Sequence, residues 1–227
     1  VPALVRSLQP GMTFISDRGI EEHTFSSAGL YWWGIPGLRP SIDRYMSEDL
    51  STGDVGRTRL RVADVHAEYK KGDKGDSYGT LFRGVFIEAD FHKDFRTELY
   101  VMPENYLKSA SMVLLSELGE RMDLENPDFE KAFVVFGQDS VEARYILTPD
   151  MQERLLLLKR VLGNDLRIAF KDSNVYIATS INKDMFDPQL SRPANCPEQI
   201  KELTQQLAAC FHVVEVLDLN TRIWSKQ

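Results

Sequence analysis

The sequence contains few cysteines and few histidines. The 227 residues include two cysteines, Cys196 and Cys210, and four histidines. Two cysteines are too few for a disulfide framework, and they favour a reduced, cytosol-like compartment. Neither residue type shows the spacing of zinc ligands. We therefore expect no metal site, and no motif indicates a cofactor.

An excess of basic charge and long apolar runs are missing too. There are 34 acidic residues against 27 basic ones, and the formal net charge is -7. Nucleic-acid binding needs a concentrated basic face, so we expect no nucleic-acid partner. No apolar run approaches the roughly 20 residues of a membrane-spanning helix. The chain opens on Val1 without an initiator methionine, and we expect it to be a processed or trimmed piece.

Catalytic motifs are the third absence. The sequence has no Gly-x-Ser-x-Gly elbow, no Gly-x-Gly-x-x-Gly pattern, no Walker loop and no His-Glu-x-x-His helix. The run Lys70–Ser77 is rich in lysine and glycine but lacks the Gly-Lys-Ser/Thr ending of a phosphate loop, and it is typical of a hairpin loop. Nothing specifies a reaction, so we lean against an enzyme.

Period-two alternation predicts strands in the first half of the chain. From Arg57 the apolar residues alternate with arginines, and their parity flips at Ala63-Asp64, where we expect a bulge or a strand break. Tyr78–Phe91 is the longest strand candidate, and Glu98–Met102 is another that stops at Pro103. We expect an antiparallel meander from Arg57 to Met102.

Capping residues predict the helices. Ile20–Ala28 is a short helix candidate, and Asn126-Pro127 begins another, followed by a buried strand at Phe133–Phe136. Asp139 or Ser140 caps a further turn. Thr148-Pro149 opens a helix that ends at Gly163.

The end of the chain combines a hairpin with a long helix. Leu166–Phe170 and Val175–Thr179 form the hairpin, and an apolar stripe predicts a helix from Pro197 to Leu217. Strands come in adjacent pairs and helices come late. The sequence therefore predicts an α+β fold, with an antiparallel β-meander and hairpins packed against a few helices and a long C-terminal amphipathic helix.

Prolines break the first part of the chain. We expect residues 1–56 to form an irregular N-terminal wrap that packs on an α+β domain of residues 57–227, in a single globular unit.

Two groups of polar residues are candidate functional surfaces. Glu88 and Asp90 share one strand face, His92 would continue their row, and Lys93 follows. Paired carboxylates divide acid and base roles or hold a divalent cation, but a solvated strand end is the preferred explanation. The second group is Asp139, Glu142 and Arg144, which a helix cap plus an ion pair also explains.

Several segments resemble the bacterial family catalogued as domain of unknown function 3137. The resemblance runs from roughly Ser47 to Trp224, and its segments are Phe82–Phe86, Ala89–Lys93, Leu124–Glu130, Val141–Pro149 and Leu219–Trp224. It implies a membrane-associated protein with a membrane-spanning segment before Val1. The family has no established activity, so the resemblance transfers no catalytic residue.

The leading hypothesis is a soluble, cytoplasmic, non-enzymatic domain of a membrane-tethered bacterial protein, acting as a protein-interaction or scaffold module. One alternative is a metal-dependent or hydrolytic enzyme that uses Glu88 and Asp90. Another is a small-molecule binding module with a pocket beside the strand Gly84–Phe86.

Overall fold

The computed structural model describes residues 1–31, 42–71, 77–91, 95–106, 118–180 and 197–219. The helices of this part of the chain are α1 (Pro2–Leu8), α2 (Glu22–Ser27), α5 (Pro127–Ala132), α6 (Ser140–Ile146), α7 (Pro149–Leu162) and α8 (Pro197–Val216). The strands are β1 (Met12–Ile15), β2 (Arg44–Val55), β3 (Thr58–Lys70), β4 (Tyr78–Asp90), β5 (Leu99–Pro103), β6 (Glu120–Met122), β7 (Phe133–Gly137), β8 (Arg167–Lys171) and β9 (Asn174–Ser180).

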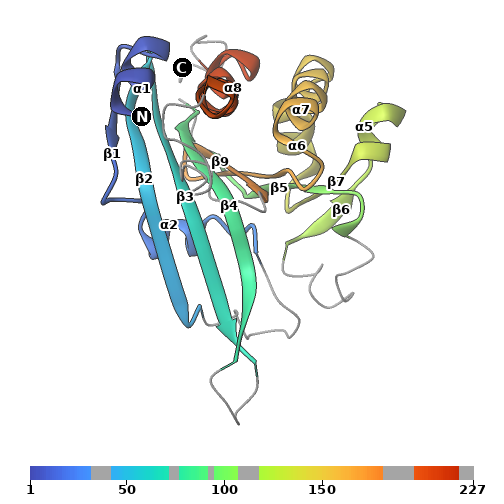
Figure 1. Ribbon diagram of the computed structural model, residues 1–227. Coiled ribbons are helices and arrows are strands. Elements are labelled where there is room, and N and C mark those ends of the chain that lie inside the picture. Colours follow the sequence, from blue (N-terminus) through green and yellow to red (C-terminus); the bar gives the residue numbers. More distant parts are fainter. Residues whose placement is uncertain (32–41, 72–76, 92–94, 107–117, 181–196, 220–227) are drawn as a thin grey trace.

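One antiparallel sheet organises these elements (Figure 1). Its nine strands lie in the order β1-β2-β3-β4-β9-β8-β5-β7-β6, and every neighbouring pair is antiparallel. Strands β1 to β4 form a meander, β8 and β9 form a hairpin, and α8 is the long C-terminal helix. The predicted α+β class is confirmed.

The place of β5 differs from the prediction. The β8–β9 hairpin lies between β4 and β5, so β5 pairs with β8 and β7 instead of continuing the meander. Three strand spacings amount to about 14 Å, which the connection from Asp90 to Leu99 spans easily because an extended residue covers about 3.3 Å. A sequence reading that joins consecutive strands cannot detect such a crossing.

The first half of β3 packs into the core on one face of the sheet, and its second half packs into the core on the other face. Leu60 and Val62 belong to the core on one face of the sheet, and Ala63 and Val65 belong to the core on the other face. This exchange of faces explains the parity flip at Ala63-Asp64 without any break in β3. Of the two predicted alternatives the break is wrong, and an irregularity is found opposite Ala63, although not in β3 itself.

The irregularity lies in the neighbouring strand. The register of β2 against β3 shifts between Glu48 and Ser51, opposite Ala63, and Asp49 takes a positive φ of 59° there. Aspartate tolerates this left-handed conformation better than most residues, which suits it to a β-bulge.

The N-terminal region is more regular than predicted. The short helix expected within Ile20–Ala28 is confirmed as α2, but β2 is a full strand where irregular structure was expected. Its sequence mixes charged residues with glycine and has few strand formers, and pairing with β1 and β3 on its two sides holds it extended. The division into a wrap and a domain remains a prediction.

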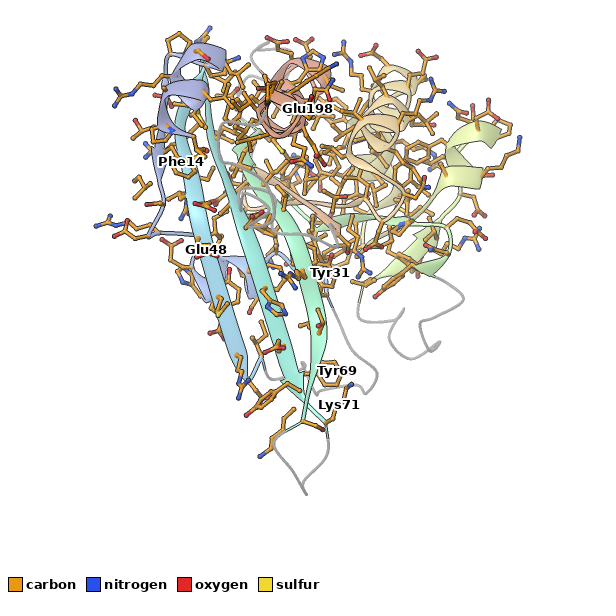
Figure 2. All side chains as sticks on the ribbon, viewed as in Figure 1. Phe14, Tyr31, Glu48, Tyr69, Lys71 and Glu198 are labelled. Carbon is orange, nitrogen blue, oxygen red and sulfur yellow. The ribbon has the colours of Figure 1, made fainter. Side chains whose placement is uncertain are left out.

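Each face of the sheet has its own helical cover (Figure 1). Helices α1, α6, α7 and α8 contribute Val5, Ala143, Leu155 and Phe211 to the core on one face. Helix α2 contributes Phe25 to the core on the other. Beyond this cover, Tyr69 and Lys71 lie at the far end of the long strands (Figure 2).

The predicted helix starts and stops are confirmed. Asn126, Asp139 and Thr148 each accept hydrogen bonds from backbone N–H groups of the helix that follows. Gly163 ends α7 with a φ of 114°, a conformation that favours glycine.

Helix α8 turns its apolar stripe to the core. Cys210 is fully buried on this stripe, and burial raises the pKa of its thiol to about 12. In the part of the chain that the structure describes, no helix has both the length and the apolar character to cross a membrane.

Phe25 provides a test of the cover that α2 forms. Its ring lies 5.3 Å from Phe86 and 5.5 Å from Phe82, centroid to centroid, and its side chain is buried. Because phenylalanine-to-alanine changes in cores cost about 3–5 kcal/mol, we expect Phe25→Ala to lower the free energy of unfolding by that amount in urea titrations. Ser26→Ala, at an exposed site of the same helix, should change it by less than about 0.5 kcal/mol. Equal unfolding midpoints for the two variants would contradict this packing.

Candidate functional site

Strands β3 and β4 place charged residues side by side on one face of the sheet. Glu88 and Asp90 are two residues apart on β4, so both side chains project from the same face. Arg59 and Arg61 have the same spacing on β3. The register aligns Arg61 with Glu88, so acidic and basic side chains face each other across the strands.

Arg61 connects two carboxylates. Its Nη1 donates to Glu88 Oε2 at 2.9 Å, and its Nη2 donates to Glu21 Oε2 at 2.6 Å. The Arg61 and Glu88 side chains are 22% and 17% exposed, whereas Glu21 is 54% exposed. The hydrogen bond from Arg61 holds the pKa of Glu21 below its usual range. The ion pair with Arg61 therefore fixes the mostly buried Glu88 side chain, and the more exposed Glu21 binds the same guanidinium.

These residues form part of a groove of about 530 Å³. Its lining residues are polar and come from four adjacent strands: Thr52, Arg59, Arg61, Glu88, Asp90 and Asn174. The volume lies in the range of about 300–1,000 Å³ that is usual for ligand sites, although such sites are mostly apolar.

Arg59 differs from the other charged residues of the groove. Its side chain is exposed, and among the described residues no ion pair or hydrogen bond engages its guanidinium. Asp54 is its register partner on β2. The groove thus offers one uncommitted guanidinium beside the committed Arg61.

A packed aromatic cluster borders the groove. Tyr176 is the register partner of Glu88 on β9, and its ring lies 6.1 Å from the ring of Phe86. Asn174 donates from Nδ2 to the Tyr176 hydroxyl at 3.3 Å. The strands that carry the groove therefore also carry Phe86 and Tyr176, which belong to the core beneath α2.

Two predicted members of this group cannot be placed. His92 and Lys93 lie outside the described residues, so the continuation of the row beyond Asp90 remains a prediction. Within the described ranges, no group of three or more histidine, cysteine, aspartate or glutamate side chains has the geometry to hold a metal ion.

The second predicted group is separated by the structure into different roles. Asp139 is the N-cap of α6, and its Oδ1 accepts from the N–H groups of Val141 and Glu142. The capping explanation of Asp139 is confirmed. Arg144 is exposed on α6, and no ion pair joins it to Glu142 in the part of the chain that the structure describes.

Glu142 is buried and binds the backbone that leads into β5. Its Oε1 accepts from the Arg96 N–H at 3.0 Å, and its Oε2 accepts from the Thr97 N–H and from the Thr97 hydroxyl, each at 2.9 Å. These three bonds fix α6 to the connection between β4 and β5. The predicted ion pair is wrong for Glu142, because its partners are a distant backbone segment that helix spacing does not reveal.

The two predicted groups lie on opposite faces of the sheet. Ala143 and Ile146, beside Glu142, pack in the same core as Ile87 and Ala89 of β4. Glu88 lies between Ile87 and Ala89 and therefore projects from the other face. The groups do not form one site.

A smaller hollow lies beside Gly84, where the small-molecule hypothesis places a pocket. It measures about 90 Å³ and is lined by Met46, Glu48, Asp64, Val65, His66, Arg83 and Gly84. This is well below the roughly 300 Å³ at which ligand pockets begin. The groove at Arg59 is the better candidate for a functional site.

Sequence reasoning missed most of the groove. The sequence did point to Arg59 and Arg61, since charged residues at alternate positions are typical of the solvent-facing side of a strand. Their alignment with Glu88 and Asp90 depends on the register of β3 against β4, which periodicity does not fix. No sequence pattern indicated that Glu21, at the start of α2, contacts the groove, because its partner Arg61 is 40 residues away.

Comparison with known families finds a match over residues 80–219 to the family described as "Protein of unknown function (DUF3137)". The match covers more than half of the chain. The chain belongs to this family. The match is shorter than the resemblance expected from Ser47 to Trp224, and it begins within β4.

The match to the DUF3137 family includes Glu88, Asp90 and the whole of α6, but Arg59 and Arg61 precede it. Comparison with curated protein sequences found no match. Among solved structures, the chain is similar to the mycobacterial trehalose monomycolate transport factor A, with a TM-score of 0.42 and 8% identity over 95% of this chain and 92% of that one. A similarity this low supports no conclusion about function.

Glu142 provides a test of how α6 is held. Because Glu142→Gln replaces a charged, buried acceptor and leaves at least one backbone N–H without its partner, we expect the free energy of unfolding to fall by about 2–4 kcal/mol. The amides of Arg96 and Thr97 should also exchange faster with deuterium. Glu153→Gln, at an exposed position of α7, is the matched control and should stay within about 0.5 kcal/mol of the wild type. Unchanged stability and exchange in Glu142→Gln would contradict the assigned bonds.

Proposed function

We propose that the domain is a protein-interaction module of a bacterial membrane-associated protein, on the cytoplasmic side, and that the Arg59 groove is its docking surface. The observation that carries this proposal is the all-polar lining of an open groove built on four rigid strands. Attachment to a membrane is the part of the proposal that rests on the family resemblance alone.

The lining favours a polypeptide over a small molecule. Small-molecule sites bury most of the ligand against apolar and aromatic side chains, with a few polar groups for orientation. The groove presents arginine, acidic and amide side chains on one face of the sheet instead. Protein interfaces tolerate such polar surfaces because bridging water and paired charges satisfy the polar groups on both sides.

Charge gives the groove its selectivity. Arg59, whose guanidinium no ion pair or hydrogen bond engages within the described residues, offers a contact for a partner carboxylate. Complementary charges of this kind mainly set orientation and specificity.

The enzymatic alternative is the second candidate, because Glu88 and Asp90 do project into one groove. The ion pair between Glu88 and Arg61 weighs against it, since one carboxylate oxygen is already committed at 2.9 Å. An acid–base pair needs a group that can exchange its proton with a substrate.

The proposal is tested first by locating a partner. A photo-crosslinking amino acid at position 52, where the uncharged Thr52 lines the groove, should capture a discrete protein in the native bacterium, and the same amino acid at position 6 on the opposite side of the sheet should not. Arg6 is an exposed arginine of α1, which packs with the other core.

Purified partner then gives the affinity test. We expect Arg59→Glu to weaken binding by at least about tenfold, because reversal places like charges together in the groove. Arg6→Glu makes the same charge change elsewhere and should alter the dissociation constant by less than about twofold. Equal effects of the two reversals, or no crosslink specific to position 52, would sink the proposal.

A further inference from the structure

Glu21 does not line the groove, but it contacts Arg61, which does. It occupies the N-cap position of α2, but its side chain makes no capping hydrogen bond to that helix. It reaches instead to Arg61 Nη2, at 2.6 Å. The Glu21 carboxylate therefore binds the Nη2 end of the Arg61 guanidinium, while Glu88 binds the Nη1 end.

The two carboxylates on Arg61 are held unequally. Glu88 is 17% exposed and lies on the neighbouring strand, whereas Glu21 is 54% exposed. Exposed ion pairs change an equilibrium constant by no more than about fivefold, because both partners regain water when they separate. Glu21 can therefore be displaced at small cost while Glu88 stays in place.

The arginines of β3 present a repeated spacing to a ligand. Arg59 and Arg61 are two residues apart on one face, which separates them by about 6.6 Å along the strand. Carboxylates at alternate positions of an extended peptide have the same separation. An acidic segment lying along β3 would place one carboxylate on Arg59 and the next on Arg61, at the position of Glu21.

We infer that the groove binds an extended acidic peptide segment, and that Glu21 is an internal competitor occupying the Arg61 position which a ligand carboxylate takes. This inference rests on the proposed function and names the chemistry of the partner. Ligand binding releases the Glu21 side chain from Arg61, and release of Glu21 in turn tightens ligand binding, since coupling is reciprocal.

The charge state of Glu21 is consistent with this role. The hydrogen bond from Arg61 lowers its pKa, so Glu21 is ionised throughout the neutral range. The stabilising effect of the pair is present above the usual glutamate pKa and is lost as the pH falls through the lowered value. Competition therefore operates under ordinary conditions.

A synthetic peptide provides the test. The probe is a capped pentapeptide of alternating glutamate and threonine, titrated at low ionic strength into the whole chain while the Arg61 side-chain NMR signals are followed. We expect Glu21→Gln to tighten binding by about three- to fivefold. Glu22→Gln removes the same charge from an adjacent exposed residue that does not contact Arg61, and should change binding by less than about twofold.

Two further arms define the ligand. Arg59→Gln should weaken binding of the alternating peptide, and a peptide with its glutamates in one block should bind more weakly because the spacing is lost. Equal tightening by Glu21→Gln and Glu22→Gln would show a general charge effect and overturn the competitor role. Absence of binding to the wild type and to both variants would overturn the acidic ligand, while a crosslinked partner at position 52 would still support the docking groove.

Discussion

The exchange of buried faces within β3 is the constraint on which the rest of the structure depends. Leu60 and Val62 pack beneath the helices of one face, and Ala63 and Val65 pack beneath α2 on the other. Consecutive residues in a strand point to opposite faces, so the first pair is covered on one face of β3 and the second pair, further along the strand, on the other. The helical layers on the two faces of the sheet are therefore offset from each other along β3.

The offset leaves a polar part of the sheet uncovered. On the face where α2 buries Ala63 and Val65, the earlier positions Arg59 and Arg61 lie beyond the aromatic cluster. An exposed sheet face needs polar side chains, and cross-strand ion pairs satisfy them at little cost. Arg61 is paired with Glu88 and Glu21, whereas no ion pair within the described residues engages Arg59.

Local chemistry predicted much of the fold. Asn126, Asp139 and Thr148 identified three helix starts, because a side-chain oxygen at an N-cap serves the first free N–H groups whatever the tertiary context. Strand order, the bulge in β2 and the bonds of Glu142 were not predictable, because each depends on a partner distant in sequence. The same is true of the groove: Glu88 and Asp90 were found by spacing, but their arginine neighbours required the register.

The central claim is tested most directly by thiol accessibility along β3. Single cysteines at Arg59, Val62 and Val65, in a background with Cys196 replaced by serine, can be labelled with a polar thiol reagent; buried Cys210 should contribute little. The account predicts fast labelling at Arg59 and slow labelling at both Val62 and Val65, although the last two point to opposite faces. Fast labelling at Val65, matching Arg59 on the same face, would contradict a change of buried face and with it the origin of the groove.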